Sequence, residues 1–295
     1  MNNTVAVVVT YNRRELLIEN IKCLLRQTSP VDIIVIDNNS TDNTYEYIYQ
    51  FIKSKQIIYF NTGTNLGGAG GFNFGIKQAV IKGYDYIWIM DDDCMPYSDA
   101  LTQLFKADAY YNGNYGFLSS KVLWRDGSIC TMNLQRRTLT KSINYKCNKD
   151  YISVSMASFV SLFLKSSIVK EVGLPIKDFF IWTDDWEYTR RISKKYPCYV
   201  VSQSIVIHKS QSNIGANIAS DSLDKLERYR YLYRNDVYLY RREGIVGFLY
   251  EFIRLSVHLI KILFTSQDGK LKRIKTMLRG TKEGIGFKPS IEFLE

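Results

Sequence analysis

Four short apolar segments alternate with helix-like segments in the first third of the chain, and this alternation restricts the fold more than any other feature. The apolar segments cover residues 5–10, 32–37, 56–60 and 84–90, and their Val, Ile, Tyr and Phe content is typical of buried strands. Residues 15–26, 43–53 and 65–82 are predicted helices. Repeated strand–helix units predict an α/β domain with a mostly parallel, doubly wound sheet and helices on both faces.

Polar residues follow three of these predicted strands directly. They are Thr10, Tyr11, Asn12 and Arg13 after the first strand, Asp37, Asn38 and Asn39 after the second, and Asp91, Asp92 and Asp93 after the fourth. Ligands of doubly wound sheets bind at the carboxyl ends of the strands. We therefore expect the three clusters to share one crevice.

The three aspartates form the densest group of negative charge in the first half of the chain. Buried carboxylates need a compensating cation, and their oxygens suit hard ions such as Mg²⁺ or Mn²⁺. Alternate residues of an extended segment, Asp91 and Asp93, can reach one ion or its bound phosphate, while Asp92 points elsewhere. The alternative is an acidic turn neutralised by water and a nearby Lys. Phosphate chemistry is the first hypothesis for this cluster.

A second acidic group, Asp184 and Asp185, lies in an aromatic segment much further along the chain. Partial burial raises the pKa of a carboxyl group, which suits a general base. The alternative is helix capping, with Thr183 or Asp184 at the first position and acidic residues favoured by the helix dipole. His208 follows a predicted strand at residues 199–207 and is either an imidazole ligand for the same cation or a structural residue.

A glycine-rich stretch, residues 65–75, opens the third predicted helix. Glycine lets backbone approach a ligand closely, and a helix N-terminus favours anions. The stretch lacks the Gly-Lys-Ser/Thr ending of a P-loop and the spacing of a dinucleotide fingerprint. Tight packing of the helix against a strand is the alternative to ligand binding.

Composition narrows the class of protein. The chain has 295 residues, 46% of them hydrophobic, which is enough for one large domain or a domain with an appendage. Five cysteines at irregular spacing, Cys147 among them, and an N-terminus without a signal-peptide pattern predict a cytoplasmic protein. Residues 225–295 contain fifteen Lys and Arg against eight Asp and Glu, and without a nucleic-acid motif we expect no nucleic-acid partner.

The C-terminal region has its own pattern. Between residues 245 and 264 the titratable side chains are Glu251, Arg254, His258 and Lys261, a spacing that gathers them in one narrow stripe of a mostly apolar helix. Such a helix either lies at a membrane surface or packs on the main domain. The basic residues that follow, up to residue 282, favour peripheral contact with an anionic membrane.

The motifs taken together and in order resemble the inverting family 2 glycosyltransferases with the GT-A fold. The matching segments are VVVTYNR, VIDNNSTDNT, NLGGAGGFNFGI, WIMDDDC and FIWTDDWEYTRR, spread over the first 210 residues. Within this family the glycine run, the DD-x-E block and YRYLYRN look most like bacterial galactofuranosyltransferases of cell-surface polysaccharide synthesis, with rhamnosyltransferases close behind. The resemblance implies a catalytic domain over residues 1–222, with a nucleotide-binding half to residue 95 and an acceptor half after it. A basic, helical region of residues 223–295 follows.

The resemblance also implies roles for individual residues. The nucleotide-sugar site would comprise Thr10, Tyr11, Asn12, Arg13, Asp37, Asn39, Asn65, Gly67, Gly68, Asp91 and Asp92. Asp91, Asp93 and His208 would hold Mn²⁺ or Mg²⁺, and Asp185 would be the catalytic base. Asp184, Glu187, Trp182 and Trp186 would bind the acceptor, although core packing explains the two tryptophans equally well.

The reaction implied is transfer of a sugar from a nucleotide-diphosphate donor, with UDP-galactofuranose favoured, to a glycan or a polyprenyl-diphosphate-linked glycan. This would serve capsule, O-antigen or cell-wall synthesis at the inner face of a bacterial membrane, and a homo-oligomer is not excluded. The alternatives are a dTDP-rhamnose-dependent transferase and a non-catalytic scaffold of a polysaccharide assembly complex. A pyrophosphorylase-like enzyme would need a basic, Gly-rich loop after the first strand, where the chain has residues 10–13.

Overall fold

The computed structural model describes residues 3–145 and 149–294, so the predicted free cysteine at 147 lies outside the described residues. The strands are β1 (Thr4–Thr10), β2 (Asp32–Asp37), β3 (Ile58–Asn61), β4 (Tyr86–Asp91), β5 (Cys94–Pro96), β6 (Leu118–Trp124), β7 (Tyr151–Ser153), β8 (Leu162–Lys165) and β9 (Tyr199–His208). The helices are α1 (Arg14–Leu25), α2 (Thr44–Lys53), α3 (Gly67–Ile81), α4 (Ala100–Tyr110), α5 (Ser166–Val172), α6 (Asp184–Ser193), α7 (Leu226–Arg241), α8 (Gly244–Thr265) and α9 (Lys270–Gly286).

One sheet forms the centre of the N-terminal part of the fold, with strand order β3-β2-β1-β4-β8-β6-β9-β5 and β7 paired to β9. Strands β1 to β4 are parallel, as predicted, and β6 runs parallel to β9. The second half is mixed, because β8 is antiparallel to β4 and both β5 and β7 are antiparallel to β9. The prediction of a mostly parallel sheet is therefore correct for the first half and incomplete for the second.

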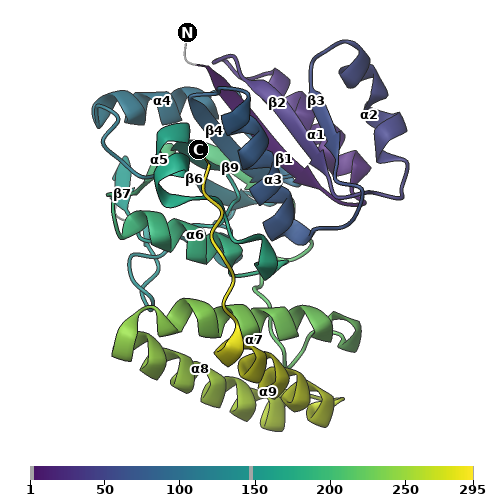
Figure 1. Cartoon of the computed structure of the whole chain (residues 1–295), viewed down its shortest axis with the longest axis vertical. Helices are drawn as coiled ribbons and strands as arrows, with labels where there is room; N and C mark the ends of the chain where they lie inside the picture. Colours follow the sequence, from purple (N-terminus) through teal and green to yellow (C-terminus); the bar gives the residue numbers. More distant parts are fainter. Residues whose placement is uncertain (1–2, 146–148, 295) are drawn as a thin grey trace.

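Both faces of the sheet are covered by helices, which confirms the predicted α/β layering (Figure 1). Alternate residues of β1 enter two separate buried clusters: Val5 and Val7 lie with α3, α5 and α6, whereas Ala6 and Val8 lie with α1, α2 and α4. This follows from the two-residue period of a strand. A fully apolar strand such as β1 is the pattern expected when both faces are buried.

The apolar segment of residues 153–164 is not one strand. The structure divides it into the end of β7 and the start of β8. Residues between them form a loop in which Met156 bridges to Arg136 and Ser161 has a φ of +62°. A left-handed residue cannot continue a strand, so the apolar pattern there reflects burial in a loop.

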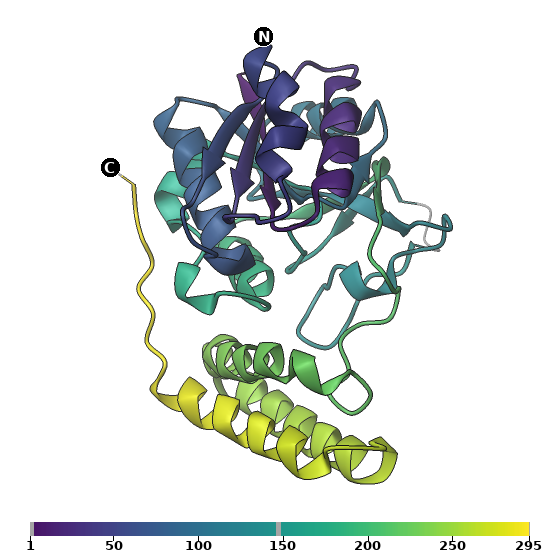
Figure 2. The ribbon, with the colours of Figure 1, turned by 90° about the vertical axis from the view of Figure 1, so that its right-hand side faces the viewer.

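Helices α7, α8 and α9 form a layer below the sheet domain, with α7 nearest to it (Figures 1 and 2). Helix α7 packs against α6, α8 and α9. The chain then returns to the sheet domain: the N–H of Leu174 donates to the carbonyl of Glu292 at 2.8 Å, and the Glu292 carboxylate pairs with Lys77 at 2.6 Å. The predicted boundary near residue 222 stays a prediction, and the last described residues cross it.

Three of the four residues in the polar stripe predicted on residues 245–264, Glu251, Arg254 and His258, face inward in the structure, whereas Lys261 is exposed. Arg254 of α8 pairs with Asp236 of α7 and, at 2.9 Å, with Glu251 one turn earlier on its own helix. His258 Nδ1 lies 2.8 Å from the hydroxyl of Tyr233. Helix α8 is therefore held to α7 by buried polar contacts as well as by apolar packing of Leu255, Leu259 and Ile262.

Replacing Arg254 tests this contact. We expect Arg254→Met to lower the free energy of unfolding by about 3–5 kcal/mol, because two buried carboxylates lose their cation. Urea unfolding followed by circular dichroism measures the change. The matched control is Arg279→Met on α9, whose exposed guanidinium pairs with Glu283 at 3.0 Å and should cost less than about 1 kcal/mol. Equal losses in the two variants would contradict a dominant role for the buried pair.

Candidate active site

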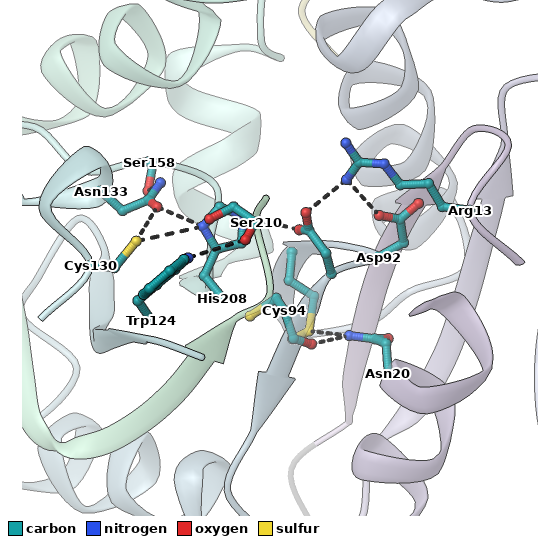
Figure 3. Close-up of polar contacts among 12 residues, drawn as sticks. Arg13, Asn20, Asp92, Cys94, Trp124, Cys130, Asn133, Ser158, His208 and Ser210 are labelled. Atoms are coloured by element: carbon teal, nitrogen blue, oxygen red, sulfur yellow. Dashed lines mark hydrogen bonds and ion pairs between the residues drawn. The ribbon is translucent and has the colours of Figure 1, made fainter. Parts of the chain in front are cut away.

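The carboxyl ends of β1 and β4 meet, and their polar residues contact each other directly. Asp92 accepts a hydrogen bond from Thr10 Oγ1 at 2.7 Å, and Arg13 Nη1 lies 3.3 Å from Asp92 Oδ1 and 2.7 Å from Asp93 Oδ2. Figure 3 shows the guanidinium of Arg13 between the two carboxylates. The parallel register of β1 and β4 produces this proximity, since it sets Val9 beside Asp91. Arg13 is thus the cation that faces the acidic turn, in the place of the Lys named in the alternative interpretation.

The three carboxyl groups have different acidities because their surroundings differ. Burial raises the pKa of Asp92 to about 7 although Arg13 acts in the opposite direction. Burial and the neighbouring charge of Asp93 raise the pKa of Asp91 to about 6. Burial acts the same way on Asp93, but its contacts with His208 and Arg13 outweigh it and lower its pKa. Asp93 is therefore the most acidic member of the cluster.

His208 reaches the cluster because β9 pairs with β5, which sets His208 opposite Cys94. Its Nε2 lies 3.1 Å from Asp93 Oδ1, and its Nδ1 lies 2.8 Å from Asn133 Oδ1 (Figure 3). Burial lowers the pKa of the imidazole, but Asp93, the Cys130 thiol and the charge of Asp91 outweigh it and raise that pKa to about 10. Sequence reasoning missed Asn133, which fixes the orientation of the ring.

These residues fit a divalent cation. A ligating His commonly donates its other ring nitrogen to an oxygen, which is the arrangement that Asn133 provides. Asp93 Oδ1 is buried without a hydrogen-bond partner and lies 3.1 Å from His208 Nε2, so a bound cation would satisfy it. Over residues 3–145 and 149–294, no three His, Cys, Asp or Glu side chains are already gathered around one point. Carboxylate and imidazole donors suit Mn²⁺.

The residues after β1 and β2 hold two loops together. Asn12 Oδ1 accepts from the N–H of Thr41 at 2.7 Å, and its own N–H donates to Ser40 Oγ at 2.9 Å. Asp37 is 1% exposed and accepts from Tyr59 and from the N–H of Ser40. These bonds join the loops at the carboxyl ends of β1 and β2. Tyr11 and Asn39 are exposed in these loops.

The glycine stretch is used chiefly for packing. Gly67 has a φ of +69°, and a Cβ there would lie 2.1 Å from the carbonyl oxygen of Phe180. A Cβ on Gly71 would lie 2.6 Å from Val9, and one on Gly75 would lie 2.4 Å from Val7. Helix α3 therefore touches β1 and the loop before α6. At Gly68 a Cβ would meet open space, and Asn65 Oδ1 accepts from the N–H of Gly67 at 2.8 Å.

Asp184 and Asp185 form the first turn of α6, where the sequence predicted a helix start. Thr183 does not cap this helix, since its hydroxyl donates to Asp236 Oδ1 at 2.7 Å. Burial raises the pKa of Asp184 to about 7, and burial with the charge of Asp184 raises the pKa of Asp185 well above its usual range. The charge of Asp91 acts in the same direction on both. The charge at the end of β4 therefore acts on both carboxyl groups at the start of α6.

The loop that precedes α6 is strained. Phe180, Trp182 and Thr183 have φ values of +64°, +64° and +67°, in the left-handed region that non-glycine residues seldom adopt. The buried side-chain amide of Asn235 on α7 lies 3.0, 3.1 and 2.9 Å from the carbonyl oxygens of residues 179, 181 and 182. Asn235 thus holds the loop that delivers Asp185. It is the last residue of the YRYLYRN motif, the one signal in the sequence that pointed to it.

The remaining predicted acceptor residues make contacts within the protein. Both Glu187 oxygens accept from Arg191, at 3.1 and 2.9 Å. The Trp182 ring packs on Tyr229, with ring centroids 5.1 Å apart. The guanidinium of Arg136 lies 4.6 Å from the centre of the Trp186 ring, a contact that sequence reasoning also missed. Packing roles account for these three side chains, and roles in acceptor binding stay predictions.

Comparison with known proteins gives a consistent result. Residues 5–149 match the model of the family described as Glycosyl transferase family 2. Galactofuranosyltransferase GlfT1 of Mycolicibacterium smegmatis is 26% identical over 255 residues, which are 81% of this chain and 83% of that protein. Poly-beta-1,6-N-acetyl-D-glucosamine synthase of Staphylococcus epidermidis is 29% identical over 57% of this chain and 40% of that protein.

Solved structures share the fold. S. aureus TarS 1-349 in complex with UDP superposes with a TM-score of 0.55 at 15% identity, covering 96% of this chain and 72% of that chain. GalNAc-T7 with UDP, GalNAc and Mn²⁺ gives a TM-score of 0.59 at 15% identity, covering 78% of this chain and 48% of that chain. At this identity the likeness establishes the fold alone, which is GT-A.

Replacing Asn235 tests its positioning role. We expect Asn235→Ala to lower the turnover number at least tenfold while the affinity for the donor nucleotide changes less than twofold, because the loop before Asp185 loses its anchor. Steady-state kinetics and calorimetry measure the two quantities, and thermal unfolding confirms that the variant is folded. The matched control is Asn114→Ala at an exposed position. A purely structural role would lower stability with no change in the turnover of the folded fraction.

Proposed function

Since this chain is a family 2 glycosyltransferase with the GT-A fold, we propose that it transfers galactofuranose from a UDP donor to a glycan or polyprenyl-linked glycan of a bacterial surface polysaccharide. The observation that carries the proposal is the presence of two buried acidic centres whose charges influence each other. One, at the end of β4, suits a nucleotide diphosphate with its cation, and the other, at the start of α6, suits an acceptor hydroxyl. The charge of Asp91 affects the pKa of both Asp184 and Asp185.

Similar proteins support the choice of donor. The relative with the longest match described above is a galactofuranosyltransferase, and TarS was crystallised with UDP. Both similarities favour a donor with a uracil nucleotide, which we propose binds beside Tyr11, Asn12 and Asn39. We propose that the open backbone at Gly68, next to Asn65, borders the ribose and diphosphate. A dTDP-rhamnose donor is the alternative that the nucleotide experiment below separates.

A divalent cation would be held by Asp91, Asp93 and His208. The structure of GalNAc-T7 contains Mn²⁺, which supports the use of such a cation by a protein with this fold. When bound, such a cation offsets the charge that develops on a departing nucleoside diphosphate. Asp93 is suited to this role because its pKa is lowered, so it is ionised at neutral pH. Arg13, which already contacts Asp92 and Asp93, adds positive charge at the same place.

Asp185 is proposed as the catalytic base. Its raised pKa makes the ionised carboxylate a stronger base than an exposed Asp, so it can take the proton of the attacking hydroxyl. Attack on the anomeric carbon from the face opposite the diphosphate inverts the configuration in one displacement. The acceptor would lie near Asp184 and the rings of Trp182 and Trp186, with Glu187 setting the position of α6 through Arg191.

Nucleotide binding tests the donor and the cation. We expect calorimetry to show UDP binding that is tightened at least tenfold by Mn²⁺, with weaker binding of dTDP and GDP. Asp93→Ala should abolish the Mn²⁺-dependent gain, whereas the exposed control Asp224→Ala should keep it. A preference for dTDP would favour the rhamnosyltransferase alternative, and no binding of any nucleotide would contradict a donor site at β4.

The dependence of transfer on pH tests the base. Asp185→Asn should lower transfer by about 10²–10⁴-fold with UDP affinity retained. In the wild type, transfer should decline as the pH falls through the raised pKa of Asp185, because the base becomes protonated. Asp184→Asn removes a neighbouring negative charge, so the pKa of Asp185 falls and the acid limb should move to lower pH. An acid limb that stays at the same pH in Asp184→Asn would remove Asp185 from this role.

A further inference from the structure

Helix α8 exposes large apolar side chains to solvent along its whole length. Ile245, Phe248, Phe252 and Phe264 are 80%, 66%, 63% and 82% exposed. The same surface includes Val246, Leu249, Ile253, Val257, Ile260 and Leu263. A contiguous apolar patch of this kind on a protein surface marks a site of interaction with a protein or a membrane.

The orientation of α8 differs from that expected for a helix that only packs on a domain, because its inward side combines charged residues with Leu255, Leu259 and Ile262 while a broad apolar side stays exposed. Such a helix turns its apolar side inward and its charged side to water. Here Glu251, Arg254 and His258 face α7, where Arg254 pairs with Asp236 and His258 contacts Tyr233. The inward polar contacts fix the rotation of the helix, so its apolar side has to face away from the protein.

Basic residues flank this apolar surface. On α9, Leu271, Lys275, Leu278, Lys282 and Ile285 are all exposed and follow one another at intervals of four and three residues, which sets them on one side of the helix. Exposed Lys261, Lys270, Lys272 and Arg279 lie on the same two helices. Both α8 and α9 lie on the side of α7 away from the sheet domain (Figures 1 and 2).

We propose that the outer surface of α8 and α9 docks on an anionic lipid bilayer, with α8 lying in the plane of the interface. Leu, Ile and Phe side chains enter the boundary of the acyl chains, and the Lys and Arg side chains contact anionic headgroups. The alternation of apolar and basic residues on α9 selects this occupant, because a second copy of the same basic surface would bring like charges together. None of the described helices is long and apolar enough to cross a membrane.

The docking also orients the catalytic half. Helix α7 separates the outer surface from the start of α6, since it contacts α6 on one side and α8 and α9 on the other. One layer of helix is about 10 Å thick. A lipid-linked acceptor would therefore need to extend only this far from the headgroups to approach Asp185. This last step rests on the proposed function, whereas the docking itself does not.

Vesicle flotation of the full chain tests the docking. The wild type should float with vesicles of phosphatidylglycerol and phosphatidylcholine and remain at the bottom with phosphatidylcholine alone. Phe248→Glu/Phe252→Glu should lower the floated fraction more than tenfold, and Lys275→Glu/Lys282→Glu should remove the preference for anionic vesicles. The matched control, Ile81→Glu, changes a 63% exposed side chain at the end of α3 and should float like the wild type.

Three results would overturn the docking: no flotation of the wild type, equal flotation of the Phe248→Glu/Phe252→Glu variant, or equal loss in the Ile81→Glu control. Sedimentation analysis adds a fourth, a dimer that the Phe248→Glu/Phe252→Glu variant abolishes, which would assign the surface to a second copy. Calorimetric binding of UDP is measured on the same proteins. If the protein does not float with vesicles but still binds UDP, the membrane-docking proposal is contradicted and the proposed glycosyltransferase function is not.

Discussion

The carboxylate of Asp236 is the contact on which the arrangement of the site depends. Its oxygens meet the hydroxyl of Thr183, directly before α6, and the guanidinium of Arg254 on α8. Beside it, Asn235 binds the strained loop of residues 179–182. Two adjacent residues of α7 therefore connect the acidic start of α6 to the helical layer. A loop with three left-handed residues persists only when its surroundings determine it, and these two residues do so.

Strand pairing in the sheet brings together the polar residues of the candidate active site. Parallel pairing of β1 with β4 brings Thr10 and Arg13 to the aspartates, and antiparallel pairing of β5 with β9 brings His208 to Asp93. Neither contact is local in sequence, yet both are fixed by strand register. Burial then separates the acidities of carboxyl groups that are chemically identical, with a lowered pKa at Asp93 and a raised pKa at Asp185. The roles proposed above, a cation held by Asp93 and a proton accepted by Asp185, require this difference.

Much of this arrangement was predictable from the sequence. Strands β1 to β4 and the helices between them follow from apolar periodicity, and the acidic clusters stand out because charge at a strand end is costly to bury. The antiparallel strands of the second half were not predictable, because short apolar segments such as β8 resemble buried loops. Asn133 was also beyond reach, because an isolated Asn carries no pattern. The YRYLYRN motif contains Asn235 but did not indicate its role, which depends on partners brought near by the fold. The sequence could not show which way the polar residues of α8 face, because their orientation depends on where the fold places Asp236.

The return of the chain end to the sheet domain has a consequence for synthesis. The carbonyl of Glu292 receives the N–H of Leu174, and its carboxylate meets Lys77 on α3 and Lys177 before α6. Ile291 packs with Phe179, directly before the strained loop. These contacts form only after residues 291 and 292 have left the ribosome, so the loop before α6 gains this support more than one hundred residues after its own synthesis. Shorter nascent chains contain the acidic residues of the site but lack the contacts that residues 291 and 292 make around the loop before α6.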